Sequence, residues 1–98
     1  MDSCYAKLKD DSEKHLNDEY RPLKKRISEN YSSNKEMADD YSSRLLNAQR
    51  YWLKYRGQQC AMEAFLADSG TQANATLVNE CVSRMDEHRI VEMKALPY

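Results

Sequence analysis

Three cysteines and two histidines have the most distinctive chemistry of this 98-residue sequence. A cysteine acts as a nucleophile when it lies in a partly exposed, electropositive setting beside a base such as histidine. Cys4 is the candidate if it is unpaired, but it stands at the start of the chain, far from His15 and His88. The sequence therefore predicts no catalytic site and no enzyme.

The histidines also give little support to a metal site. His15 and His88 could be drawn beside Asp11 or Glu92, but neither has a second ligand at a helical metal-binding spacing such as H-x-x-x-H. The two glycines, Gly57 and Gly70, are too far apart to form a phosphate-binding loop. We expect no metal and no cofactor.

The composition favours long helices in one domain spanning residues 1–98. Charged residues make up 32% and hydrophobic residues 41%, with only two glycines and two prolines, so turn chemistry is too sparse for a sheet. The net charge of −1 gives no global field for nucleic acid, and no run approaches the roughly 20 apolar residues of a membrane span. The fold class predicted is all-α.

Apolar spacing divides the chain into three helices. The first is expected from Ser3 to about Tyr31, either kinked by Pro22 or split there into two abutting helices. Its apolar residues recur at three- and four-residue steps or their sums: Cys4, Leu8, Leu16, Tyr20, Leu23, Ile27 and Tyr31.

The second and third helices carry start and stop signals. Ser33 and Glu36 form a capping box that predicts the second helix start, and Gly70 followed by Thr71 predicts the break before the third. The second helix has the stripe Tyr41, Leu45, Ala48, Trp52 and Tyr55, continuing through Cys60, Met62 and Leu66. The third, ending near Ala95, has a face made of Leu77 or Val78, Cys81, Met85, Val91 and Leu96.

Short turns between long helices predict an antiparallel up-down-up bundle, in which residues equidistant from a turn share a level. Cys60 and Cys81 lie about ten and eleven residues from Gly70, so each is near 15 Å along its helix. Counting around the first turn brings Cys4 to almost the same level, and level alone does not choose the pair. We predict a Cys60–Cys81 disulfide stapling the bundle, with Cys4 as a free or unpaired thiol.

The same counting predicts a polar layer around Trp52. Trp52 falls level with Arg89 and with residues 13–17, so Arg89 is expected to stack on the indole or to pair with Glu13. Gln49 and Arg56 flank Trp52 on the same helical side and would join a hydrogen-bonding network there.

Across nearly its whole length the chain resembles the bacterial LprI-type lysozyme-inhibitor family. The resemblance rests most specifically on "AQRYWLKYR" followed by Cys60, and further on Leu16-Asn17, Tyr20, Gly70, Cys81, Arg89 and Leu96. It implies a structural motif that includes Asn17, Gln49, Trp52, Arg56 and Arg89. It also implies a four-cysteine domain, so a trimmed precursor whose fourth cysteine and signal peptide are missing would explain the odd count.

For function, the resemblance implies a periplasmic or secreted protein that inhibits lysozyme or a muramidase-like hydrolase by protein contact. Such an inhibitor would present acidic surface to a cationic enzyme, around an inserted basic or polar side chain. Candidate contact residues are the acidic Asp10, Asp11, Asp39 and Asp40 and the exposed Tyr5 and Tyr51. A structural or assembly module of the envelope and an immunity protein against a rival's toxin remain alternatives, and a homodimer is compatible with the sequence.

Overall fold

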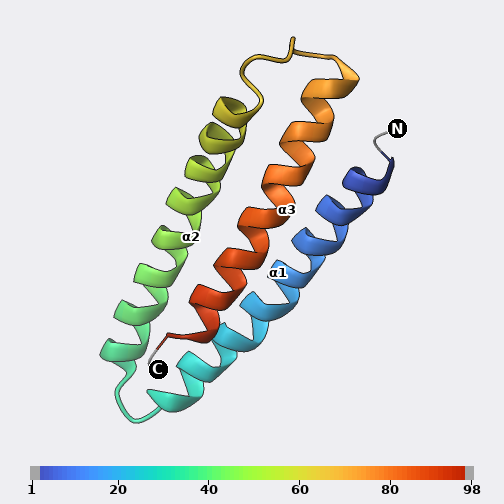
Figure 1. Cartoon of the computed structure of the whole chain (residues 1–98). Helices are drawn as coiled ribbons and strands as arrows, with labels where there is room; N and C mark the ends of the chain where they lie inside the picture. The colour runs from blue at the N-terminus through green and yellow to red at the C-terminus, as the bar shows by residue number, and fades with distance from the viewer. Residues whose placement is uncertain (1–2, 97–98) are drawn as a thin grey trace.

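The computed structural model describes residues 3–96 as three long helices joined by two short turns. The helices are α1 (Ser3–Asn30), α2 (Lys35–Glu63) and α3 (Gln72–Lys94). Figure 1 shows α1 running down, α2 running up and α3 running down, so that α2 is antiparallel to the other two helices and α3 lies between α1 and α2. The predicted all-α, disulfide-stapled bundle is confirmed.

Helix α1 is continuous through Pro22, so the alternative of two abutting helices is wrong. Leu23 and Ile27 follow the proline on the buried face and are at most 1% exposed. Pro22 itself is exposed, which keeps its ring out of the packed interface. Burial of the next turns therefore holds the helix together across a residue that lacks a backbone donor.

The N-cap of helix α2 lies one residue later than predicted, and the helix ends before the last residue of its predicted apolar stripe. Asn34, and not Ser33, is the N-cap, and its side chain accepts a hydrogen bond from the Met37 amide at 3.0 Å. The helix ends at Glu63. Leu66 therefore lies outside it and is 97% exposed, so the predicted continuation of the buried stripe to Leu66 is wrong.

The second turn has the predicted chemistry. Gly70 takes a φ of +82°, which L side chains rarely adopt, and Thr71 caps α3 by accepting from the Asn74 amide at 3.2 Å. The Asn74 side chain then donates to the carbonyls of Ala64 and Ala67, at 3.3 and 3.1 Å. These bonds tie the carbonyls that follow the end of α2 to the first turn of α3.

The core lies along α3, on which α1 packs more extensively than α2 does. One cluster contains Leu16, Leu23, Ile27, Leu45, Ile90 and Met93, and a second contains Cys60, Cys81 and Val82. Four other residues of the predicted apolar stripes do not face inward, because Leu8 is 46%, Tyr55 57%, Met62 62% and Val91 68% exposed. The buried stripe of α3 instead follows Val82, Asp86, Ile90 and Met93.

The result is an elongated body measuring 52 × 21 × 18 Å. None of the helices in the described part of the chain has an apolar stretch long enough to cross a bilayer.

Candidate functional site

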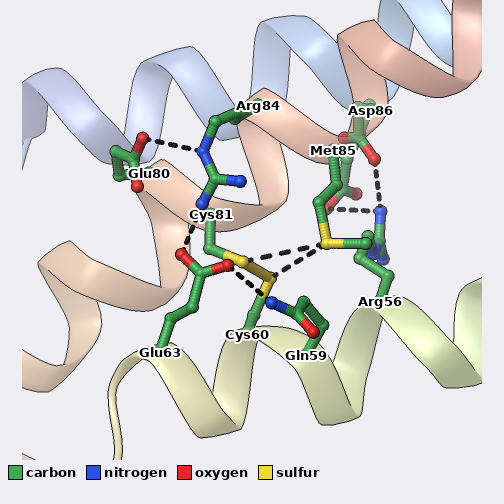
Figure 2. The surroundings of a disulfide bond; sticks show 10 residues. Arg56, Gln59, Cys60, Glu63, Glu80, Cys81, Arg84, Met85 and Asp86 are labelled. Atoms are coloured by element: carbon green, nitrogen blue, oxygen red, sulfur yellow. Dashed lines mark hydrogen bonds and ion pairs between the residues drawn. A yellow bond between two sulfur atoms is a disulfide. The ribbon is translucent and has the colours of Figure 1, made fainter.

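A disulfide joins α2 to α3 near the second turn, as predicted. Cys60 and Cys81 are buried, their α carbons are 5.5 Å apart, and the bond closes a sequence separation of 21 residues. Figure 2 shows Met85 against this bond, with its sulfur 3.8 Å from each cysteine sulfur. The bond fixes where α2 ends relative to the start of α3.

A small charged group lies beside the disulfide (Figure 2). Arg84 donates to Glu63 across the two helices and to Glu80 on its own helix. A hydrogen bond from Gln59, together with the charge and hydrogen bond of Arg84, lowers the pKa of Glu63 from its ordinary value. The hydrogen bond to Glu80 and the charges of both carboxylates raise the pKa of Arg84. One arginine is therefore shared by two carboxylates, one from each helix.

About one helical turn from the disulfide, on the side away from the α2–α3 turn, lies what we term the polar layer. It is made of Ser12, Glu13, Arg56 and Asp86. Asp86 is 0% exposed and accepts hydrogen bonds from Arg56 at 2.8 Å and from the Ser12 hydroxyl at 2.9 Å. Glu13 lies 4.0 Å from the same guanidinium. The layer thus joins all three helices through one buried carboxylate, and such a carboxylate is tolerated only when its partners are in place.

Trp52 lies beside this layer and is half-buried. The Arg56 guanidinium is 5.4 Å from the centre of its ring, so Arg56 takes both roles that the sequence assigned to Arg89. Arg89 instead donates to Gln49 at 3.0 Å and approaches Glu92. Gln49 and Arg56 thus each hydrogen-bond to a residue of α3.

Two members of the polar layer escaped the sequence analysis. The sequence does not predict Asp86 and Ser12 as members of a buried network. A charged residue on a helix is usually expected to face solvent, and a single serine gives no periodic signal of burial. The available signal was the spacing of Val82, Asp86 and Ile90, which puts a carboxylate in the middle of an apolar stripe, at the level of Arg56.

The remaining residues of the expected motif and the histidines lie apart from this network. Asn17 is exposed on α1, and Cys4 is an exposed free cysteine near its start. His15 contacts Glu87 at 3.3 Å, whereas His88 lines a hollow of about 280 Å³ with Trp52 and Tyr55. Across residues 3–96, no three side chains of metal-binding type are grouped to hold an ion.

The candidate contact residues are exposed but do not form one surface. Tyr31 and Tyr41 stack at 5.8 Å, which puts the start of α2 beside the end of α1. Asp39 and Asp40 immediately precede Tyr41, and Asp11 lies 20 residues before Tyr31, about 30 Å along the helix. The two acidic pairs therefore lie near opposite ends of the molecule. Tyr5 is 38% and Tyr51 is 69% exposed.

The most exposed large apolar side chains lie where α2 passes into the turn before α3. We call the last two residues of α2 together with this turn the tip (residues 62–71). Phe65 is 81% and Leu66 is 97% exposed, and Met62 beside them is 62% exposed. A shallow hollow of about 370 Å³ adjoins Phe65, lined on one side by Ala61, Ala64 and Val78. Phe65 and Leu66 have the largest exposed fractions of the large apolar side chains in residues 3–96. Adjacent apolar side chains that are this exposed are uncommon on small domains and often mark a contact site.

These features describe a disulfide-linked helical scaffold with an exposed apolar end. Comparison with curated proteins and with solved structures finds no match. The sequence profile of the family described as "Lysozyme inhibitor LprI" does match, over residues 1–93, and so covers all three helices, the disulfide and the polar layer. The chain therefore belongs to the LprI lysozyme-inhibitor family.

Proposed function

We propose that this protein inhibits lysozyme-like peptidoglycan hydrolases by direct protein contact, in the periplasm or outside the cell. The observation that carries the proposal is the family match over residues 1–93, because the family is one of inhibitors and not of enzymes. An inhibitor needs a stable shape and a contact surface, and no reactive group of its own.

The scaffold suits this role physically. Its disulfide and buried ion pair fix the relative positions of the helices, so few degrees of freedom remain to be lost when a partner binds. A disulfide that closes the bundle also fits an oxidising compartment, where such bonds persist. Periplasmic or secreted location is therefore part of the proposal.

The acidic and tyrosine residues are proposed as accessory contacts. Asp10 and Asp11 with Tyr5 on α1 would attract and touch a cationic hydrolase from one side. Asp39 and Asp40 lie too far from them for a single small hydrolase domain to use both pairs as one rim. Tyr51, on α2, is a separate candidate contact.

The test is a binding and activity assay. The oxidised chain is immobilised and offered a cationic lysozyme and a panel of bacterial muramidases, and any captured enzyme is then tested for clearing of a cell-wall suspension. We expect a complex at micromolar concentration or below, together with slower clearing. If no hydrolase is retained at that concentration and clearing is unchanged, inhibition is wrong and a structural or assembly role in the envelope is favoured.

A further inference from the structure

The tip presents two adjacent side chains in a manner suited to insertion. Phe65 and Leu66 are 81% and 97% exposed, although each would gain from burial. They lie at the end of the molecule, in the turn that extends past the first residues of α1 in Figure 1. A projecting apolar end can bury more of its surface in a concave partner surface than against a flat partner surface.

The tip is also held rigidly from behind. Ala64 is 0% exposed, and the Asn74 side chain bonds the carbonyls of both Ala64 and Ala67, on either side of Phe65 and Leu66. The Ala67 amide donates to the Ala64 carbonyl at 3.0 Å, and the Cys60–Cys81 bond lies one turn below. A turn fixed in this way loses little conformational entropy on binding, which favours affinity.

The charges around the tip select the kind of partner. Residues 57–84 contain the acidic Glu63, Asp68 and Glu80 and one basic residue, Arg84, which pairs with Glu63 and Glu80, so this stretch keeps a net charge of −2. A second copy of the chain would bring the same negative charge to the contact, and an anionic membrane would repel it. A cationic protein with an apolar cleft complements both the charge and the shape.

We propose that the tip is the inhibitory element, with Phe65 and Leu66 inserting into the substrate cleft of a cationic peptidoglycan hydrolase. This proposal rests on the proposed function and assigns it to a surface. Clefts that bind small ligands are lined mainly by apolar and aromatic groups, which Phe65 and Leu66 would contact, while the carboxylates face the basic rim. The inserted group is therefore apolar, unlike the basic or polar side chain expected from the sequence.

The experiment compares the wild-type chain with F65S/L66S in inhibition of a cationic lysozyme, measured as clearing of a cell-wall suspension. Both side chains are exposed, so the variant should keep the wild-type melting temperature and helical circular dichroism. Removing apolar anchors at the centre of an interface should raise the inhibition constant at least about 30-fold. An N-acetylglucosamine trimer that occupies the cleft should compete with the wild-type chain for the enzyme.

The matched control is M37S/V91S, which removes two apolar side chains that are 52% and 68% exposed and lie towards the other end of the bundle. It should inhibit as the wild type does. If F65S/L66S inhibits as well as the wild type, the tip proposal is overturned while the proposed function stands.

Two further readouts identify other occupants. Loss of vesicle co-sedimentation in F65S/L66S with an unchanged inhibition constant would assign the tip to a membrane and overturn the proposal. Conversion of a dimer to a monomer in light scattering, again with inhibition unchanged, would assign it to a second copy. If the wild-type chain inhibits no hydrolase, the proposed function itself fails and the tip proposal fails with it.

Discussion

Asp86 is the residue whose environment most constrains the others. It is 0% exposed, yet it carries a carboxylate that receives hydrogen bonds from Arg56 on α2 and Ser12 on α1. A buried ion pair contributes little net stability compared with a well-packed apolar pair, but loss of one partner leaves an uncompensated charge. Its main contribution is to define which residues of the three helices meet.

Arg56→Ala should therefore destabilise the fold by about 3 kcal/mol, because it leaves the Asp86 carboxylate buried with the Ser12 hydroxyl as its remaining partner. The measurement is urea unfolding with the disulfide intact. The control is Arg44→Ala, since the Arg44–Asp40 pair is exposed on both sides and should contribute less than about 1 kcal/mol. Equal losses for the two variants would contradict a buried, charge-paired layer.

Of the Arg56–Asp86 ion pair, the sequence predicts the role of Arg56 but not that of Asp86. Arg56 was predicted to join a network because it lies four residues after Trp52 on the same side of the helix. Its partner could not be chosen by level, because Glu13 and Asp86 both lie within reach of the Arg56 guanidinium. The choice depends on which carboxylate the packing of α3 buries.

The helices themselves were predictable because their apolar periods and end signals are strong. The turn at Gly70, the cap at Thr71 and the level of the two bonded cysteines all follow from spacing. The buried face of α3 was predicted less well. Asp86 is a charged residue within that face, so the apolar residues alone indicated a different face that includes Val91. The end of α2 was missed because Asn74, ten residues after Ala64, supplies the bonds that complete it.

The two glycines offer a matched test of the element ends. Gly57 lies within α2, and a β carbon added there would meet no atom within 4 Å, so Gly57→Ala should stabilise the protein by about 1 kcal/mol. Gly70→Ala has equal space but a φ of +82°, and should destabilise it by about 1 kcal/mol. Thermal unfolding of both variants gives the comparison. Shifts of the same sign would be inconsistent with the turn described.

Removal of the disulfide tests the connection between α2 and α3. C60S/C81S should lower the free energy of unfolding by about 3 kcal/mol, because a closed loop of this length restricts the unfolded chain. The corresponding fall in melting temperature is about 15 °C for a domain of this size. Cys4→Ser is the control, since this exposed thiol lies outside the bond and should change stability by less than about 0.5 kcal/mol.

At the scale of the whole molecule, charge is distributed unevenly along an elongated body. The basic run Arg21, Lys24, Lys25 and Arg26 lies in the second half of α1. Residues 57–84, which form the tip and the helix ends beside it, carry three carboxylates and one cation. The net charge of −1 is a sum over the chain and does not show that basic and acidic residues are concentrated in different parts of it. A cationic partner would be attracted toward the tip and turned so that its basic rim approaches first.

This separation predicts a salt-dependent rate of association with a cationic hydrolase. Between low and high salt the association rate should fall by about tenfold or more, with a smaller change in the dissociation rate. E63Q/D68N/E80Q should reduce that dependence, and D10N/D11N, at a distance from the tip, should reduce it less. Surface plasmon resonance at several ionic strengths provides the rates. A rate that does not respond to salt would argue against steering by the tip.

The Cys60–Cys81 bond lies directly behind the apolar turn, and this placement couples maturation to compartment. In a reducing cytosol the two thiols stay apart, so a newly made chain would carry Phe65 and Leu66 on a hairpin held by weaker forces alone. In the periplasmic or extracellular location proposed above, oxidation would then lock that hairpin. On that proposal, the chain would become able to bind only after oxidation, in the compartment that holds the cell wall.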